Sequence, residues 1–495
     1  MRIDPIATHG RARAKCLAVV DLESGRRWDW ETLDRAVNRV ANWLIGEVGP
    51  KSGARIATLS RNNADMLILQ HGCIRAGAIF VPFNWRLAEA EVAGLIADAQ
   101  PARFFRDADF AVPNFPGALY ELNDLNAMTA DQPEMPPPLT ARQDILAPST
   151  LLYTSGTSGR PKGVMVSVSN AFWGATNFIH GSDVSNQSVF LCDMPMFHTA
   201  GLFAAVSVPI LAGGTVLISK GFDPVTTLAR IADPALGVTH YFSVPQMAQM
   251  LWNQPAFKPD MMRGLKFYAT GGAPNPAAQI ERFITAGIPM SNGFGMSETC
   301  SNFAMPLADV AVVRAKGSSC GLPLLTIETR LVDDDGVDVN DGETGELWLR
   351  GPSITLGYWN QPELTEASFS NGWFRTGDAA LRDADGFFYL VDRKKDMYIS
   401  GGENVYPAEV EAAVAEMTDV AECAVIGVSD EKWGEVGKAF VIAAPGKSVM
   451  PGDVIAHCKS RLAGFKVPKS VVVGVAIPRT ASGKAQKHLL KDIEG

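Results

Sequence analysis

A loop rich in glycine and small hydroxyl residues, at positions 153–164, constrains what this chain can fold into more than any other feature. Its sequence, YTSGTSGRPKGV, follows a short apolar run that is typical of a buried strand. Glycines allow a close backbone approach with N–H groups turned inward, and Arg160 and Lys162 add positive charge. The other donors and glycines are Thr154, Ser155, Gly156, Thr157, Ser158 and Gly159. The segment predicts a polyphosphate site at the end of a strand.

Two alternatives to this site can be weighed from the pattern alone. The P-loop requires a glycine, four residues and then Gly-Lys-Ser/Thr, and residues 153–164 do not match it. A flexible Ser/Gly linker is the ordinary interpretation of such a composition. Linkers rarely carry Arg-Pro-Lys between apolar flanks, as residues 160–162 do here, so we favour the phosphate site.

Length and charge limit the class of protein. At 495 residues the chain is about three times the length of a typical domain, which predicts two or more domains. Hydrophobic residues make up 47% and charged residues 20%, so a disordered or fibrous chain is excluded. The formal net charge of −9 gives no general attraction for nucleic acid or anionic lipid, so local groups must hold any anionic ligand.

Cysteine usage and the apolar runs indicate the cellular compartment in which the protein is expected. The seven cysteines form no Cys-x-x-Cys pair, which indicates reduced thiols and argues against a zinc site. The basic N-terminal segment lacks the apolar core of a secretory signal. The most apolar stretch, 201–218, is interrupted by Pro209 and by Gly213-Gly214, so it predicts a buried helix and strand and no membrane span. We therefore expect a cytoplasmic protein.

Helical and strand-like patterns alternate in the first part of the chain. Positions 33–44 repeat apolar or small residues at helical spacing. A second helical stretch, 66–74, lies between apolar runs at 56–59 and 78–82, as in a layered α/β domain with a partly parallel sheet. Residues 121–147 are polar and rich in proline, and predict a surface connection.

The C-terminal part predicts a separate unit. Residues 420–428, 439–443 and 471–477 have the pattern of three strands, and 454–462 predicts a helix between the last two. A unit of this kind is a small α+β domain of roughly a hundred residues.

Seven further motifs follow the loop in order. They are PMFHTAG at 195–201, GGAP at 271–274, NGFGMSE at 292–298, GELWLRG at 345–351, WFRTGD at 373–378, DRKKD at 392–396 and PRTASGK at 478–484. Taken together they resemble the adenylate-forming enzymes, a family that includes acyl-CoA synthetases, luciferases and peptide-synthetase adenylation domains. Any one motif would be weak evidence, but the ordered set spans nearly the whole chain.

This resemblance implies the fold class and the domains. It predicts an α/β fold with a large layered N-terminal domain of mixed sheets and helices at 1–394. A small mobile α+β C-terminal domain would occupy 395–495. Lys395 matches the family's hinge, about which the small domain would rotate between two half-reactions. A solvated pair of charges is the ordinary alternative for Lys394-Lys395.

The resemblance also implies how ATP is bound. Gly271, Gly272 and Ala273 with Phe294 would sandwich adenine, and Asn292 would lie near its amino edge. Asp378 would accept hydrogen bonds from both ribose hydroxyls, with help from Arg393; a turn or helix-cap aspartate is the alternative. The remaining residues assigned to the nucleotide are Gly293, Gly295, Met296 and Ser297.

Four residues are implied to be catalytic. Ser297 and Glu298 resemble the pair that meets phosphate and magnesium, because a hard cation favours carboxylate oxygen; Thr154 is the second expected metal contact. Serine stands at 297 where the family more often has threonine, and it keeps the hydroxyl. Lys484 would bridge the carboxylate and the α-phosphate during adenylation, although a solvated tail lysine is the ordinary expectation. The four catalytic residues are Lys162, His198, Glu298 and Lys484.

The thiol substrate would need a second surface. Gly401 and Gly402 would form a narrow channel for pantetheine, because glycines leave room for it. Trp433, Phe465 and Lys466 resemble the elements that line the remainder of coenzyme A.

His198 matches a family position beside the acyl pocket and the nascent carboxylate, with a core histidine as the alternative. Many relatives have Thr-His-Arg after the phosphate loop, whereas this chain has Ser-Val-Ser at 167–169, so pocket contacts near that helix are not carried over. The candidate residues of the acyl pocket are apolar and partly aromatic, which fits a medium-chain fatty acid or an aryl acid such as a benzoate or cinnamate. The set is Phe197, His198, Phe203, Phe242, Ser243, Gly271, Met296, Cys300 and Phe303.

The function implied is that of an ATP-dependent carboxylate–CoA ligase. The carboxylate would attack the α-phosphorus of ATP to give an acyl-adenylate and pyrophosphate, and coenzyme A would then displace AMP. The expected cofactors are ATP, Mg²⁺ and coenzyme A. The expected partner is a small carboxylic acid, and a homodimer is the commonest assembly for an enzyme of this kind. Loading of a carrier-protein thiol, or a catalytically inactive nucleotide- or acyl-binding regulator, stays open.

Overall fold

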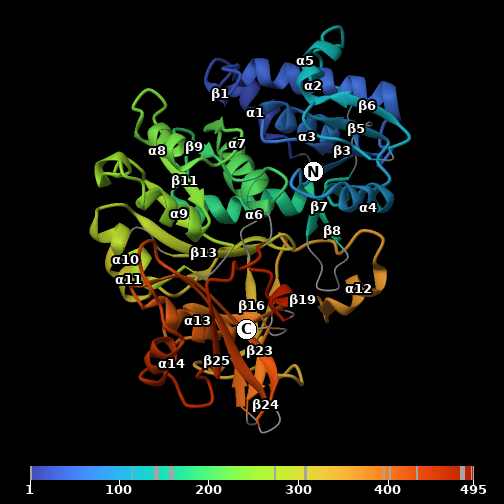
Figure 1. The fold of residues 1–495 in the computed structure, drawn as a ribbon. Coiled ribbons are helices and arrows are strands. Elements are labelled where there is room, and N and C mark those ends of the chain that lie inside the picture. Colours follow the sequence, from blue (N-terminus) through green and yellow to red (C-terminus); the bar gives the residue numbers. More distant parts are fainter. Residues whose placement is uncertain are drawn as a thin grey trace.

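In the part that the structure describes, the chain forms four β-sheets with helices between and around them (Figure 1). The computed structural model describes residues 3–113, 115–138, 144–154, 161–272, 275–305, 309–393, 396–400, 403–430, 433–479, 485–491 and 493. Across these ranges, no helix combines the length and the apolar character that a membrane span needs.

The first sheet has six strands and ends at the strand that follows the glycine-rich loop. Its order is β6-β5-β3-β4-β7-β8, parallel except for the antiparallel pair β7–β8. The strands are β3 (Arg55–Leu59), β4 (Ile79–Phe83), β5 (Arg103–Arg106), β6 (Ala118–Glu121), β7 (Pro148–Thr154) and β8 (Lys162–Ser167). The partly parallel sheet predicted from the runs at 56–59 and 78–82 is confirmed.

The second sheet has nine strands, in the order β15-β14-β13-β12-β11-β9-β10-β1-β2. Six consecutive strands, β13 to β1 in this order, run parallel, and the edge pairs β1–β2, β13–β14 and β14–β15 are antiparallel. The strands are β1 (Leu17–Asp21), β2 (Arg27–Asp29), β9 (Val189–Cys192), β10 (Thr215–Ile218), β11 (His240–Ser243), β12 (Phe267–Thr270), β13 (Met290–Met296), β14 (Cys300–Ala304) and β15 (Leu322–Pro323).

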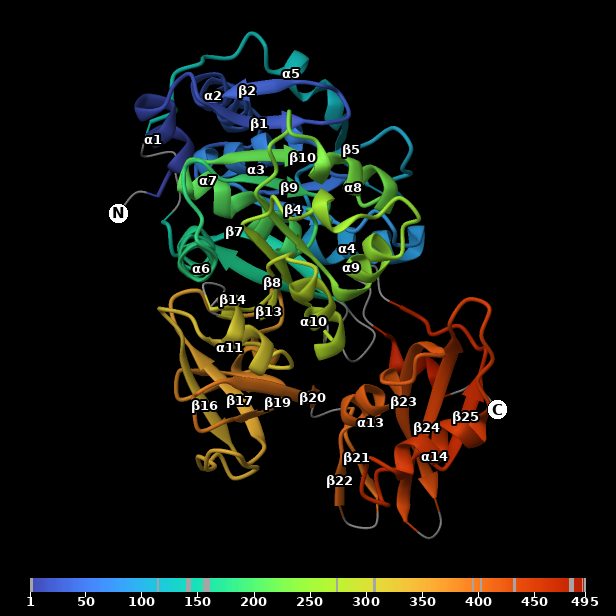
Figure 2. The same cartoon turned by 90° about the vertical axis from the view of Figure 1, so that its left-hand side faces the viewer.

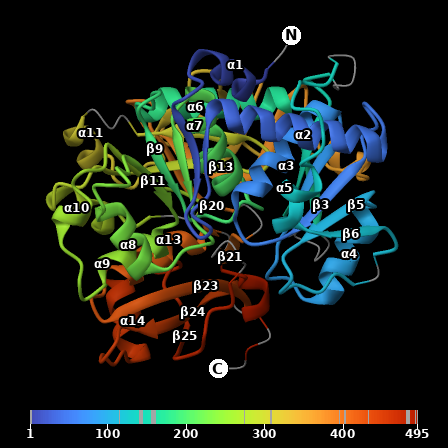
Figure 3. The same ribbon diagram turned by 90° about the horizontal axis from the view of Figure 1, so that it is seen from above.

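Helices α2 (Trp30–Val48) and α3 (Ala64–Ala76) contribute to the core that joins these two sheets (Figure 3). The Asp29 side chain accepts a hydrogen bond from the Thr32 N–H at 2.7 Å and so begins α2, while Gly49, with φ at +78°, ends it. The helical spacing at 33–44 becomes a face of buried leucine, valine and alanine. The predicted amphipathic helix is therefore confirmed.

The apolar stretch at 201–218 folds as a helix and a strand, as its interruptions predict. A π-helix (Ala200–Ser207) continues into α7 (Val208–Ala212) and is followed by β10. Gly201 is required here, because a Cβ would overlap the carbonyl oxygen of Pro195. This close approach ties the start of the π-helix to the PMFH segment before it.

The third sheet and the C-terminal sheet lie beside each other below the two large sheets (Figure 2). The third is antiparallel and contains β16 (Glu328–Val332), β17 (Gly345–Arg350), β18 (Phe369–Ser370), β19 (Trp373–Arg382) and β20 (Phe388–Arg393). The C-terminal sheet contains β21 (Tyr398–Ser400), β22 (Glu403–Val405), β23 (Val420–Asp430), β24 (Gly434–Ala443) and β25 (Ser470–Val473).

The C-terminal sheet has two strands more than the sequence pattern predicted. β21 and β22 have three residues each, which is too short for an alternating pattern to be recognised. β25 is shorter than the predicted strand at 471–477, because the chain turns at Gly474, where φ is +85°. The predicted C-terminal helix is α14 (Pro451–Lys459), and the α+β character of the unit is confirmed.

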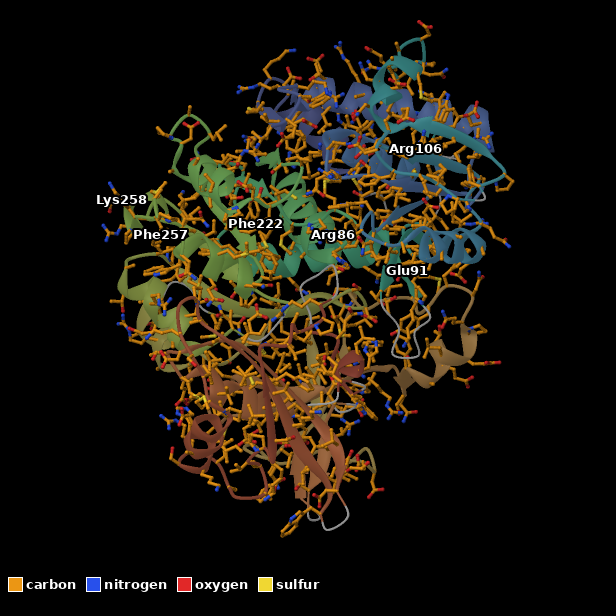
Figure 4. The ribbon with its side chains drawn as sticks, viewed as in Figure 1. Arg86, Glu91, Arg106, Phe222, Phe257 and Lys258 are labelled. Carbon is orange, nitrogen blue, oxygen red and sulfur yellow. The ribbon has the colours of Figure 1, made fainter. Side chains whose placement is uncertain are left out.

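The other helices cover the sheets, and side chains fill the space between the layers (Figure 4). They are α1 (Pro5–Ala12), α4 (Glu89–Ala99), α5 (Leu125–Met128), α6 (Val168–Ser182), α8 (Pro224–Ala232), α9 (Pro245–Trp252), α10 (Ala277–Thr285), α11 (Val310–Ala315), α12 (Pro362–Ala367) and α13 (Pro407–Ala415). Short 3-10 turns are at Leu122–Asp124, Pro259–Met261 and Lys487–Leu490.

His240 of β11 should make stability depend on pH. Its buried ring stacks on Phe190 at 4.7 Å, and burial lowers its pKa to about 4. The unfolded chain therefore binds a proton that the native chain does not between pH 6.5 and 4, so stability falls as the pH falls through this window, by roughly 3 kcal/mol. A His240→Phe variant should lose this component. Urea unfolding of both proteins across that range tests it, and parallel pH profiles would contradict it.

Candidate active site

The base of the glycine-rich loop is well defined. Strands β7 and β8 form an antiparallel pair whose last partners are Thr154 and Lys162, so these two predicted residues lie side by side where the loop begins and ends. The Lys162 ammonium lies 5.3 Å from the centre of the Tyr358 ring. The loop itself falls outside the described residues, and with it the predicted positions Ser155, Gly156, Thr157, Ser158 and Gly159.

The segment between β17 and β18 of the third sheet pairs with β8. The Met165 N–H donates to the Gly357 carbonyl at 2.9 Å, and the Trp359 N–H donates to the Gly163 carbonyl at 2.7 Å. Between these bonds Tyr358 forms a bridge with Val164. Gly357 has φ at +116°, and a Cβ there would overlap the Thr365 side chain, so the segment requires glycine.

Glu298 is held from two directions after the end of β13. Its backbone carbonyl accepts a hydrogen bond from the Thr355 N–H at 2.6 Å. Its side-chain Oε1 accepts from the Tyr358 hydroxyl at 3.0 Å. The neighbouring Ser297 hydroxyl is bonded to that of Thr199, 3.2 Å away, at the start of the π-helix. The predicted magnesium residue thus lies next to the phosphate-loop strand and to the PMFHT segment.

Tyr358 and Thr355 were missed by reasoning from the sequence, and Thr199 was noted only as part of the PMFHTAG motif, with no role assigned. Tyr358 follows a glycine in an ordinary Gly-Tyr-Trp stretch and lies 60 residues from Glu298 in the chain. No local pattern connects such a tyrosine with a distant carboxylate. Only the pairing of its segment with β8 brings the two together.

The donor set fits a magnesium ion that arrives with a polyphosphate. Among the residues that the structure describes, no group of three or more His, Cys, Asp or Glu side chains could hold a metal ion by itself. Mg²⁺ is commonly bound by one or two carboxylates, with phosphate oxygens and water completing an octahedron. The Glu298 carboxylate would supply the protein's oxygen to such an ion, whereas Thr154 stays a prediction.

The predicted adenine site lies at the ends of β12 and β13. A Cβ at Gly271 would be 3.0 Å from the Phe242 ring and 3.3 Å from the Gly293 carbonyl oxygen, so this turn has no room for a side chain. Asn292 is buried, and within the described structure its Oδ1 has no hydrogen-bond partner. A buried acceptor without a donor fits an amino group such as that of adenine. Ala273 lies outside the described residues.

Four other residues assigned to the nucleotide extend along the same strand. Gly293, Phe294, Gly295 and Met296 continue β13, and the pairing with β14 shifts register between Phe294 and Gly295. The Phe294 ring is partly buried, 5.8 Å from the Phe303 ring. The register shift is a local irregularity in the ladder beside the predicted base site.

The predicted ribose residues are neighbours in the third sheet. Asp378 of β19 is paired in register with Arg393 of β20. Asp378 is buried, and its N–H donates to the Thr376 hydroxyl at 3.0 Å. Gly377, with φ at +69°, precedes it where the pairing of β19 with β17 shifts register. The backbone therefore places the two predicted residues together; the Arg393 side chain lies outside the described part of the chain.

The PMFHT segment is fixed by a buried amide. The Asn62 side chain donates to the Met194 carbonyl at 2.9 Å and accepts from the Met196 N–H at 2.8 Å. His198 follows, with its ring 4.5 Å from that of Phe197, and its carbonyl accepts from the Leu202 N–H at the start of the π-helix. The positions of both predicted pocket residues therefore depend on a clamp that no sequence pattern indicated.

The other predicted pocket residues divide among several packed regions. Phe242 contacts Gly271 and lies 6.3 Å from Phe178 of α6. Ser243 is buried, with its hydroxyl 3.1 Å from that of Tyr268. Phe203 lines a cavity of about 60 Å³ beside α3 and α6. Phe303 packs among aromatic rings of the third sheet's core.

Cys300 packs closely against α6. It adopts a left-handed backbone with φ at +56°, and a Cβ on Gly174 of α6 would lie 2.5 Å from its own Cβ. Burial raises the pKa of its thiol to about 12. The Cys300 thiol is therefore neutral near pH 7, and its position supports a role in pocket shape.

The residues predicted for coenzyme A are in the C-terminal part. Trp433 is 40% exposed, with the Lys469 ammonium 6.0 Å from its ring centre. The Lys466 ammonium donates to Glu409 at 2.7 Å and lies 5.7 Å from the Phe465 ring. An exposed indole beside an ammonium group suits an anionic substrate with an apolar part. Lys395, Gly401, Gly402 and Lys484 lie outside the described residues.

The fold and site define an enzyme that binds a nucleotide polyphosphate, and comparisons with known proteins identify its family. A model described as "AMP-binding enzyme" matches residues 7–359, and one described as "AMP-binding enzyme C-terminal domain" matches residues 409–484. The chain belongs to the family of AMP-binding enzymes. The resemblance predicted from the ordered motifs, and the α/β fold class with its small α+β C-terminal part, are confirmed.

Relatives in this family are CoA ligases. The chain is 37% identical over 482 residues to a feruloyl-CoA synthase of Amycolatopsis sp, covering 96% of each. It is 33% identical over 490 residues to the long-chain-fatty-acid–CoA ligase FadD13 of Mycobacterium tuberculosis, covering 96% of this chain and 95% of that one.

A solved structure gives the same result. The o-succinylbenzoate CoA synthetase of Bacillus subtilis, in complex with its acyl-adenylate intermediate, matches with a TM-score of 0.90 and 30% identity, covering 100% of this chain and 99% of that one. The same enzyme has also been solved with ATP and a magnesium ion. The chain is accordingly an AMP-forming acid–thiol ligase, as the motifs predicted, with acyl-CoA ligase activity.

Proposed function

We propose that this chain is an ATP- and Mg²⁺-dependent ligase that joins an aromatic carboxylic acid to coenzyme A. The observation that carries the proposal is the meeting of three motifs: Tyr358 links Lys162 of the loop motif to Glu298, and the Ser297–Thr199 bond links Glu298 to the PMFHT segment. These contacts support a site in which the residues assigned to phosphate, metal and acyl group would act together, as transfer of AMP to a carboxylate requires.

The side chains have distinct tasks in the first half-reaction. Asn292 and Asp378 would hold the base and the ribose, which fixes the α-phosphorus near His198 and the acid. Lys162 would bind phosphate oxygens at the base of the loop. The Mg²⁺ ion beside Glu298 would offset the charge that develops on pyrophosphate as it leaves. Lys484 would reduce the repulsion between the attacking carboxylate and the α-phosphate.

The second half-reaction uses the C-terminal part in this proposal. We propose domains at 1–394 and 395–495 with a hinge near Lys395, and the ranges of the two family models support this division. Rotation about the hinge would withdraw Lys484 and bring Gly401 and Gly402 to the acyl-adenylate. Trp433, Phe465 and Lys466 would then contact coenzyme A, whose thiolate displaces AMP from the acyl group.

An aromatic acid is favoured by the pocket and the relatives together. The Phe242 ring lies against the turn at Gly271, and the rings of Phe197 and His198 lie 4.5 Å apart in the PMFHT segment. A flat ring packs well among such side chains. A feruloyl-CoA synthase and an o-succinylbenzoate CoA synthetase are among the relatives, while FadD13 keeps a fatty acid as the alternative.

We expect purified protein to convert an aromatic acid into acyl-CoA and AMP in equal amounts. The panel would contain benzoates, cinnamates, arylacetates and C6–C12 fatty acids with MgATP and coenzyme A, and products would be measured by mass spectrometry; reactions without ATP are the control. Turnover of fatty acids alone would reject the aromatic assignment. Acyl-adenylate without acyl-CoA would indicate a carrier-protein thiol, and absence of product with every acid would favour the regulator.

A further inference from the structure

We propose that Tyr358 is a positioning residue that holds Glu298 and Lys162 in the arrangement that binds magnesium and polyphosphate. Its hydroxyl donates to Glu298 Oε1 at 3.0 Å, while its ring lies 5.3 Å from the Lys162 ammonium. A single side chain thus contacts the acid expected to meet the metal and the lysine expected to meet phosphate. The inference rests on the proposed ATP site and adds a residue that the motifs did not assign.

Tyrosine can fix both partners without neutralising either. A phenol donates one proton and carries no charge near pH 7, so Glu298 keeps its negative charge and a second oxygen for a cation. The face of the ring attracts an ammonium by its quadrupole and does not consume the positive charge of Lys162. An arginine in place of Tyr358 would compete with the metal for Glu298, and an aspartate would compete with phosphate for Lys162.

The tyrosine is itself held rigidly. It is 6% exposed and packs in the large core with residues of α2, α3 and β8. Its N–H donates to the Thr365 hydroxyl at 2.9 Å, and its backbone bridges to Val164. The Thr355 N–H bond to the Glu298 carbonyl fixes the same two segments a second time. A side chain anchored in this way can restrict Glu298 to one orientation before any ligand binds.

We expect Tyr358→Phe to raise the Mg²⁺ concentration for half-maximal acyl-adenylate formation by about tenfold, the usual size of a lost hydrogen bond to a charged group. The ring, its packing and its contact with Lys162 are kept, so the melting temperature should hardly change. Calorimetric titration of ATP at fixed Mg²⁺ should show a similarly weaker affinity. Conversion of supplied acyl-adenylate and coenzyme A to acyl-CoA needs no magnesium and should be unaffected.

Tyr389→Phe is the matched control. Tyr389 lies on β20, and its hydroxyl donates to the Asp383 carboxylate at 3.1 Å. This variant therefore also removes a hydrogen bond between a tyrosine and a carboxylate, but the carboxylate is not one assigned to the site. It should show the wild-type dependence on Mg²⁺. In a Glu298→Gln background, Tyr358→Phe should cause a much smaller further change in the Mg²⁺ dependence, because Tyr358 would act on magnesium only through the Glu298 carboxylate.

Three outcomes would overturn the inference. One is an unchanged Mg²⁺ requirement and ATP affinity in Tyr358→Phe. Another is an equal loss in both half-reactions with a lowered melting temperature, which would indicate a structural role. The third is full additivity with Glu298→Gln. Failure of the wild-type protein to bind MgATP would instead reject the proposed function, because that measurement does not involve Tyr358.

Discussion

Replacing Glu298 with glutamine is expected to slow acyl-adenylate formation by about two to three orders of magnitude. Glutamine has nearly the same shape and still offers Oε1 to the Tyr358 hydroxyl, so the site should keep its geometry. The negative charge is lost, and with it the carboxylate oxygen that the protein would supply to magnesium. Rapid-quench measurement of adenylate formation over a range of Mg²⁺ concentrations tests this expectation.

Controls separate this effect from a general loss of activity. Glu363→Gln changes an exposed acid on α12, a few residues beyond Tyr358, and should behave as wild type. Thioester formation from supplied acyl-adenylate should be largely preserved in Glu298→Gln. If adenylation by Glu298→Gln kept the wild-type rate at every Mg²⁺ concentration, Glu298 would have no role toward the metal.

Lys484→Ala is expected to divide the two half-reactions. Adenylation should fall by roughly two to three orders of magnitude. The reason is that the carboxylate and the α-phosphate, both anions, must approach each other without the ammonium that would contact them both. Thioester formation from supplied acyl-adenylate should be largely spared, since the lysine would by then have moved away. ATP affinity should also change little, which distinguishes this variant from Glu298→Gln. Single-turnover assays of each half-reaction measure these effects.

An ordinary tail lysine provides the comparison. Lys491 is exposed and close to the same end of the chain, and Lys491→Ala should leave both half-reactions unchanged. Equal losses in both half-reactions for Lys484→Ala would contradict the bridging role. Equal behaviour of the two alanine variants would return Lys484 to the ordinary interpretation as a solvated side chain.

Much of the fold could be predicted because its signals are local. The spacing at 33–44, the apolar runs at 56–59 and 78–82, and the interruptions at Pro209 and Gly213 identified α2, β3, β4 and β10. The short strands β21 and β22 gave no such signal, since three residues contain too little alternation.

The site could be predicted only as a set of separate motifs. Glu298, Asp378 and Lys162 could be proposed as site residues because each lies in a distinctive run of neighbours. The bonds of Tyr358 to Glu298 and of Thr199 to Ser297 were not, because they join residues 60 and 98 positions apart. The Asn62 clamp on Met194 spans 132 positions and was equally hidden.

The sequence by itself determined the family, the order of the motifs that we assign to phosphate, metal and ribose, and many of the helices and strands, because backbone propensity and motif patterns depend on adjacent residues. Only the tertiary structure decided which side chains support the motifs. Pairing of the 355–359 segment with β8 brings a tyrosine between Lys162 and Glu298, and sheet topology, not local pattern, determines that contact.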